Sequence, residues 1–219
     1  MLRSICCSLV FLSGSMLASP VGASPALVVA DDAATDARQK AEKFAQESLK
    51  PFFADLKVLK EELSLANKER STWTPYTEDW KKWTPADAEA GKNSYTYGEY
   101  LWSGRKDKDF KKSPMGTLAA TKLKEWQDST GGIVAELFVT DAKGGNVCQT
   151  SPTSDWFQGD EEKFTAVENK HEFFYGEPKR DDTVGKTGVQ VSVPIWGTDN
   201  GKEIFLGVAV VLVVTDNVK

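Results

Sequence analysis

Apolar residues in the first third of the chain recur at steps of mostly three and four. The stripe covers residues 36–67 and consists of Ala37, Ala41, Phe44, Ala45, Ser48, Phe52, Leu56, Leu59, Leu63 and Ala66. This spacing places its members on one face and predicts an amphipathic helix. Pro51 lies inside the stripe, where it removes one backbone donor and crowds the preceding turn. We therefore expect a long helix with a kink at Pro51.

Residues 71–104 show no regular hydrophobic pattern, because their aromatic residues follow neither the helical nor the strand period. These residues are Trp73, Tyr76, Trp80, Trp83, Tyr95, Tyr97, Tyr100 and Trp102. The pattern predicts a long irregular segment with a short helix at 77–83, capped by Thr77, and a charged spacer at 104–112. Loops of this length are commonly functional or disordered. The aromatic residues either pin the loop onto a core or form the walls of a pocket.

The second half of the chain alternates between a helix and short strands. Ser113 and Pro114 have the N-cap and first-turn pattern of a helix that runs to about residue 129. Strands are predicted at 133–140 and 146–150, joined by a turn, and then at 172–176, 187–196 and 203–214 after a short helix. Asn200 and Gly201 indicate a tight hairpin between the last two strands, because both residues tolerate positive φ.

The two last strands differ in how they are expected to be buried. Residues 187–196 alternate, with valines and Ile195 on one face and Gln190, Ser192, Pro194 and Trp196 on the other. Residues 204–214 are apolar except for Gly207, which predicts a central strand covered on both faces. The order of elements predicts an α+β domain with one antiparallel sheet of roughly five strands.

The N-terminus has the arrangement of a secretory signal. Arg3 precedes an apolar run at 5–12, and small residues follow at 13–30. Cleavage after Ala23 or Ala30 satisfies the small-residue rule, and Ala30 is favoured because Asp31 then opens a polar mature end. The apolar run is shorter than the roughly 20 residues that span a bilayer. We expect residues 1–30 to be removed and residues 31–219 to form one periplasmic or secreted domain without a membrane span.

Composition and charge narrow the classes of function. With 40% hydrophobic residues in a chain of 219, the protein can build a core without a disulfide or a metal. Cys6 and Cys7 leave with the signal, so Cys148 cannot close an internal disulfide and is expected in the core. Arg3 is the one charge among residues 1–30, so the 27 basic and 32 acidic residues leave a net charge of −6 on the mature chain. This acidic balance argues against nucleic-acid binding.

The sequence TSDWFQGDEEKF at 153–164 is the segment with the densest candidate chemistry. His171 lies in a polar turn, and the chain has no nucleophile-elbow, phosphate-loop or zinc motif, so neither an enzyme nor a cofactor is predicted. Asp155, Asp160, Glu161 and Glu162 offer oxygen ligands for calcium, but their spacing does not follow the twelve-residue calcium loop. Acids after a glycine also suit a helix N-terminus.

Three stretches in this order resemble the extracytoplasmic PDC or Cache sensor domains: IVAELFVTDAKGGNV at 133–147, TSDWFQGDE at 153–161 and VQVSVPI at 189–195. The resemblance covers about residues 118–214. It implies a PAS-like sheet with a long N-terminal helix and a loop over the sheet that contributes to a ligand pocket. Residues 73–112 have no counterpart in it and are expected to be an insertion.

The resemblance implies that Trp156, Gln158 and Asp160 lie near a bound molecule. Gln190 and Ser192 could add polar groups from the sheet face, and Tyr175 from the preceding strand. As an ionised acceptor, Asp160 would favour a ligand that carries an amine or several donors. The competing interpretation is that Trp156 and Phe157 plug the sheet while Ser154 or Asp155 caps a helix.

Two functions follow as hypotheses. The first is an exported sensor module that binds a small molecule and signals through a separate partner, such as a membrane receptor or kinase, since the chain ends at Lys219 without an output domain. The alternative is an interaction or structural module whose sheet pocket is degenerate and whose Trp-rich segment is a docking surface.

Overall fold

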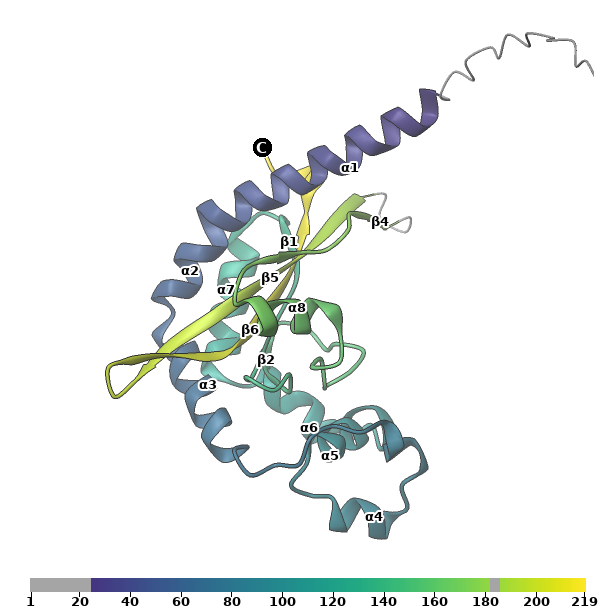
Figure 1. The fold of residues 1–219 in the computed structure, drawn as a ribbon, viewed down its shortest axis with the longest axis vertical. Coiled ribbons are helices and arrows are strands. Elements are labelled where there is room, and N and C mark those ends of the chain that lie inside the picture. Colours follow the sequence, from purple (N-terminus) through teal and green to yellow (C-terminus); the bar gives the residue numbers. More distant parts are fainter. Residues whose placement is uncertain (1–24, 182–185) are drawn as a thin grey trace, which may run out of the picture.

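The computed structural model describes residues 25–181 and 186–219 (Figure 1). The helices are α1 (Pro25–Phe44), α2 (Lys50–Asp55), α3 (Lys57–Glu69), α4 (Pro85–Ala90), α5 (Tyr95–Glu99), α6 (Lys108–Lys112), α7 (Leu118–Ser129) and α8 (Glu162–Lys170). The strands are β1 (Val134–Thr140), β2 (Asn146–Gln149), β3 (Phe174–Tyr175), β4 (Lys179–Asp181), β5 (Lys186–Asp199) and β6 (Lys202–Val214).

The predicted signal sequence falls mostly outside the described residues, because the description begins at residue 25. Ala30, the favoured cleavage point, lies within α1. None of the helices in the described part of the chain is both long and apolar enough to cross a bilayer.

One antiparallel sheet is formed by the strands of the described residues, in the order β2-β1-β6-β5-β3, with β4 also paired to β5. The predicted α+β class, with a long bent N-terminal helix and an antiparallel sheet, is confirmed. The sheet has one strand more than expected, because β4 consists of the charged residues Lys179–Asp181 and carries no apolar alternation. Asn200 and Gly201 adopt φ angles of 49° and 77°, as the predicted tight hairpin requires.

Strand β6 is central, as its apolar sequence predicts, because it pairs with β1 on one side and β5 on the other. Val211 packs in the helix-covered core, and Val210 packs on the opposite face under α8. Gly207 interrupts the apolar run for a steric reason. Its φ is 153°, and a Cβ at this position would collide with the backbone oxygen of Thr140.

The bend in the N-terminal helix is real, but its causes differ from the prediction. A π-helical turn at Ala45–Leu49 precedes Pro51, whose missing N–H is accommodated within the first turn of α2. The path then breaks at Leu56, with φ −80° and ψ 79°, where the sequence contains no proline. Lys60 Nζ donates a hydrogen bond to the freed carbonyl oxygen of Ala54 at 2.7 Å. The helix therefore wraps around one side of the sheet, as Figure 1 shows.

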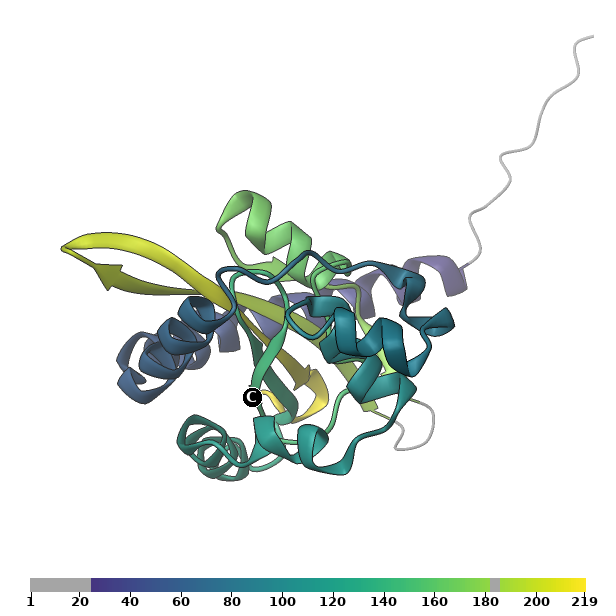
Figure 2. The same cartoon turned by 90° about the horizontal axis from the view of Figure 1, so that it is seen from below.

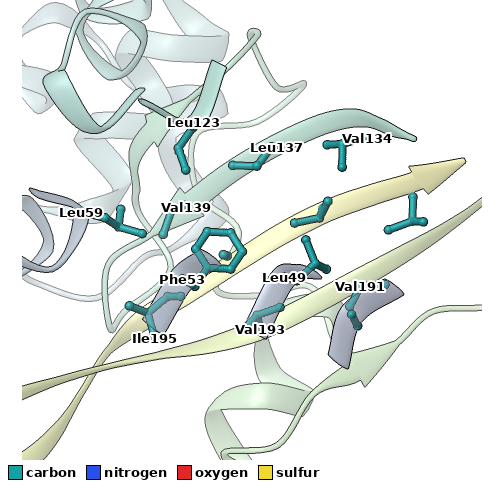
Figure 3. Packing of buried hydrophobic residues seen from close by; sticks show 14 of the residues in the cluster. Leu49, Phe53, Leu59, Leu123, Val134, Leu137, Val139, Val191, Val193 and Ile195 are labelled. Atoms are coloured by element: carbon teal, nitrogen blue, oxygen red, sulfur yellow. The ribbon is translucent and has the colours of Figure 1, made fainter. Parts of the chain in front are cut away.

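Helices cover both faces of the sheet. On one face, residues of α1, α2, α3 and α7 pack against the strands, with Leu49, Phe53 and Leu123 among the buried side chains that meet β1 and β5 (Figure 3). On the other face, Phe164 and Val167 of α8 cover a smaller apolar patch. The alternation of β5 thus separates a helix-covered core from the face that α8 covers only in part.

The segment 73–112 contains more helix than its sequence suggests. A 3₁₀ helix at Glu78–Lys82 replaces the predicted short helix, and α4, α5 and a π-helical turn at Tyr100–Gly104 follow. The expected charged spacer is wrong, because α6 forms there. Its N-cap Asp107 accepts hydrogen bonds from the N–H groups of Asp109 and Phe110. These short helices gather at the end of the sheet beyond β2 (Figures 1 and 2).

The position of β6 gives a direct test of the fold. Val211 is fully buried between the sheet and the helices, so Val211→Asp places an unpaired charge in a dry layer and should prevent folding. Leu65→Asp is the matched control, because Leu65 is 56% exposed on α3 and its replacement should cost under about 1 kcal/mol. Soluble Val211→Asp protein with a cooperative thermal transition would contradict the central placement of β6.

Candidate functional site

A cavity of about 520 Å³ lies on the face of the sheet that α8 partly covers. Its floor includes Phe174, Gly188 and Leu212, and its walls come from the start of α8 and from the segment that contains β3 and β4. We call it the sheet cavity. Its volume lies within the roughly 300–1,000 Å³ that is usual for small-molecule sites.

Gln190 brings a polar group to this floor because the side chains of β5 alternate. Val189 and Val191 point into the helix-covered core, so Gln190 and Ser192 point to the other face. The amide of Gln190 forms no hydrogen bond with any described residue and is available to a ligand. Ser192 is fully buried, its Oγ has no partner among the described residues, and it pairs in register with the cavity residue Phe174. Both residues were candidates from the sequence.

The rim of the sheet cavity carries both signs of charge. Lys163 is 14% exposed, lies 2.9 Å from the carboxylate of Glu161, and places its Nζ 5.5 Å from the ring centroid of Phe138. Glu162 adds a second acid, and Lys186 adds a second ammonium that donates to Asn217 Oδ1 at 3.3 Å. An apolar floor below a rim of both signs is suited to a small molecule that carries an anionic and a cationic group.

The stretch TSDWFQGDEEKF is divided between two regions. Its last part, Glu161 to Lys163, lines the sheet cavity, but Trp156 and Phe157 point away from it. They join Tyr95 and Trp102 in a buried group that we call the aromatic cluster.

The aromatic cluster holds Trp156 tightly. The indole is 1% exposed and packs directly on Gly98, where any side chain would collide with the ring. The contact explains the glycine in α5. Trp156 thus lies between the hairpin and the inserted helices, and it does not line the sheet cavity.

Gln158 and Asp160 also lie outside the lining of the sheet cavity. Gln158 is buried, and its Nε2 donates to the carbonyl oxygen of Asp155 at 2.7 Å. Its backbone N–H donates to Gly144 O at 2.8 Å, which ties the stretch to the β1–β2 hairpin. Asp160 is an exposed residue. Partial desolvation of its carboxyl, together with nearby acids, raises the pKa of this group.

Tyr175 lies on the other face of the sheet. It pairs with Val191, packs against the helix-covered core, and accepts a hydrogen bond from Gln46 Nε2 at 3.4 Å. The six candidates therefore do not form one site. Gln190 lines the sheet cavity, Ser192 lies beneath it, and the remaining four lie elsewhere.

The residues weighed for other chemistry have structural surroundings. Ser154 Oγ donates to Asp155 Oδ2 at 2.7 Å, and α8 begins without a side-chain cap from either residue. His171 ends α8 with φ 57° and stacks on Phe205 at 5.1 Å. Cys148 is buried, and burial raises the pKa of its thiol. Within 25–181 and 186–219, no group of three or more His, Cys, Asp or Glu side chains is placed to hold a metal ion.

A buried ion pair that the sequence did not reveal connects the end of α3, the β1–β2 hairpin and the inserted helices. Arg70, at the end of α3, donates to Asp141 Oδ2 at 2.7 Å, and Tyr95 of α5 donates to the same oxygen at 3.1 Å. The other oxygen, Asp141 Oδ1, accepts the N–H groups of Lys143 and Gly145 at 2.9 and 3.0 Å. The one available signal was an acid placed directly between an apolar strand and its turn.

The inserted helices contain a second buried acid, Glu99 of α5. Its Oε2 accepts the N–H groups of Trp156 and Phe157 at 2.8 and 2.9 Å, and its Oε1 accepts from Ser103. Burial raises the pKa of Glu99, and these hydrogen bonds offset part of the rise. Trp156 and Phe157 are thus held against the insertion through polar contacts as well as through ring packing.

Comparison with known proteins gives structural neighbours only. No family model matches the sequence, and no curated protein matches it. The ligand-binding domain of the Pseudomonas aeruginosa amino-acid chemoreceptor PctC in complex with GABA is 14% identical, with a TM-score of 0.35, over 53% of this chain and 52% of that one. An extracellular ligand-binding receptor from Desulfohalobium retbaense is 16% identical, with a TM-score of 0.34, over 73% of this chain and 25% of that one.

The sensory domain of a Campylobacter jejuni chemoreceptor with isoleucine bound is 12% identical, with a TM-score of 0.34, over 84% of this chain and 64% of that one. This chain spans about half or less of the first three matched structures. These neighbours are described as ligand-binding or sensory domains.

The buried ion pair predicts a large and specific loss of stability. Asp141→Ala removes an acceptor from the guanidinium of Arg70, from the hydroxyl of Tyr95 and from two backbone N–H groups, which should lower the free energy of unfolding by about 3–5 kcal/mol. Asp160→Ala is the control, because Asp160 is exposed and its loss should change stability by under about 0.5 kcal/mol. Equal denaturant midpoints for the two variants would refute the assigned role of Asp141.

Glu99 predicts a pH dependence of stability. Because its pKa is raised in the folded state, the folded protein binds more protons than the unfolded chain above the ordinary value of 4.5. Glu99 therefore contributes most below that value, and this stability is lost as pH rises from there through the raised pKa. In denaturant titrations at several pH values, Glu99→Gln should remove this part of the decline in the free energy of unfolding. Glu203 is exposed, so Glu203→Gln should keep this pH dependence. If the free energy of unfolding of Glu99→Gln varies with pH as it does in the unaltered protein, the pKa of Glu99 is not raised.

Proposed function

We propose that this protein is a sensor module that binds a small molecule in the sheet cavity. The observation that carries the proposal is the cavity itself, which combines an apolar floor, the unpaired amide of Gln190 and a rim of both charges. An apolar floor with one amide that has no partner among the described residues favours an occupant that places a hydrogen-bonding atom at Gln190.

The proposed ligand is a small zwitterion or amine-bearing molecule. Its anionic group would lie near Lys186 or Lys179, and its cationic group near Glu162, while its apolar part rests on Phe174 and Leu212. A polar group that reaches past Phe174 would satisfy the buried Oγ of Ser192. The two charged placements use side chains that already line the cavity.

Export and readout by a separate protein complete the proposal. The motive is the signal-like sequence at 1–30, and the partner would be a membrane receptor or a kinase that detects the occupied state. N-terminal sequencing of the exported protein tests the first part. A start near residue 24 or 31 supports export with cleavage, and an intact Met1 speaks against it.

The alternative function, a docking module with a degenerate pocket, receives less support. It requires exposed aromatic residues in the insertion, but Tyr95 and Trp102 are each at most 3% exposed, and the other aromatic side chains of the insertion are half-buried. Among the described residues, the large hydrophobic side chains that are exposed are Leu65 and Leu118, which lie outside the insertion. Solitary exposed side chains of this kind are usual on monomers.

Ligand screening with a matched pair of variants tests the proposal. Purified protein is screened by thermal shift against amino acids, carboxylates, amines and purines, and a ligand at 100 times its Kd should add about 2.7 kcal/mol of stability. Gln190→Leu should weaken the best ligand about tenfold, because it keeps the volume and removes the hydrogen bonds. Tyr175→Phe, on the opposite face, should leave the affinity unchanged.

Two outcomes would contradict the sheet cavity as the site. One is a ligand whose affinity falls in Tyr175→Phe but not in Gln190→Leu. The other is the absence of any stabilising compound across the four classes, which would return the docking alternative to first place.

A further inference from the structure

A second cavity lies at the other end of the molecule, between the end of α3, the β1–β2 hairpin and the inserted helices. It has a volume of about 310 Å³, and we call it the aromatic cavity. Four aromatic residues contribute to its walls: Trp73, Tyr76, Tyr95 and Phe157. This volume is at the lower end of the roughly 300–1,000 Å³ typical of small-molecule sites, and one ring with a short substituent fits within it.

Most polar groups of the aromatic cavity already have partners. Arg70 is bound to Asp141 and lies with its guanidinium 5.4 Å from the ring centroid of Trp73. Tyr95 donates its hydroxyl proton to Asp141. Asn67 donates to Leu206 O at 2.8 Å and accepts from Ala142 N at 3.0 Å. None of these groups needs a ligand.

Two donors at the wall remain free. Lys143 is exposed on the hairpin, and its ammonium forms no ion pair or hydrogen bond with any described residue. Tyr76 accepts a hydrogen bond from Trp80 Nε1 at 3.2 Å, and its own hydroxyl proton is donated to no described group. Burial raises the pKa of Tyr76 above its ordinary value of 10.0, so its hydroxyl is protonated at neutral pH with or without the shift.

The two groups without partners are hydrogen-bond donors, so they favour a ligand that carries an acceptor. The aromatic walls favour a ligand that carries a ring. Asp160, Glu99 and Glu78 act electrostatically on Tyr76, but none of the three lines the cavity, and Glu78 is 3.9 Å from Lys81. With the charge of Arg70 balanced by Asp141, the unbalanced charge at the wall is the ammonium of Lys143. Charge-assisted hydrogen bonds to a carboxylate are among the strongest that such a group can form.

We propose that the aromatic cavity binds a small flat aromatic carboxylate, whose ring packs against Trp73 and Tyr76 and whose carboxylate is held by Lys143. This site is separate from the sheet cavity, because the two share no lining residue. Its proposed occupant also differs, since the side-chain charge at its wall that has no partner is the ammonium of Lys143.

Calorimetric titration of the purified protein with three related probes tests this assignment. Phenylacetate is the carboxylate, phenylacetamide is its neutral analogue, and phenethylamine is the cation. We expect saturable binding of phenylacetate, weaker binding of phenylacetamide and none of phenethylamine. Lys143→Gln should weaken phenylacetate about tenfold to a hundredfold and leave phenylacetamide unaffected. Lys202→Gln, an exposed lysine at the other hairpin, should bind phenylacetate as the unaltered protein does.

Three results would overturn the proposal. The first is no saturation by phenylacetate up to millimolar concentrations. The second is equal affinity in Lys143→Gln and the unaltered protein. The third is phenethylamine binding at least as tightly as phenylacetate. Gln190→Leu should leave phenylacetate binding unchanged, and a loss there would place the probe in the sheet cavity and reject the second site.

Discussion

The buried carboxylate of Asp141 holds the long helix, the β1–β2 hairpin and the inserted helices together. It is fully buried and accepts hydrogen bonds from Arg70 at the end of α3, from Tyr95 in α5, and from two N–H groups of its own hairpin. A buried charge is tolerated only when its partners are all present. The long helix, the hairpin and the insertion must therefore be in place together, although they are far apart in the sequence.

Both cavities are positioned through that hairpin. The backbone of Gln158 is bound to Gly144, which directs the following residues towards the start of α8, where Glu161 and Lys163 line the sheet cavity. The same turn presents Lys143 to the aromatic cavity. The sheet supplies a rigid floor to the first, and packed rings supply the walls of the second. Binding residues that come from loops but rest on rigid elements are typical of ligand-binding domains.

The sequence predicted the parts of the structure whose signals are local. The alternation of β5, the apolar run of β6 and the Asn200–Gly201 turn are each readable over a few residues. The break at Leu56 and the charged strand β4 carry no such signal, because a lysine cap and pairing with β5 produce them. The same limit applies to the site. Gln190 and Ser192 follow from alternation, whereas the destination of Trp156 depends on partners at 95–110, and the face of Tyr175 depends on its register with β5.

The central claim is that the sheet cavity holds a small molecule that touches Gln190. The most direct test is a crystal structure of the protein purified under native conditions and soaked with the most stabilising compound. We expect density for that compound above Phe174 and Leu212, with a polar atom within hydrogen-bond distance of the Gln190 amide. A compound bound elsewhere, with the side chain of Phe174 turned to fill the cavity, would contradict it.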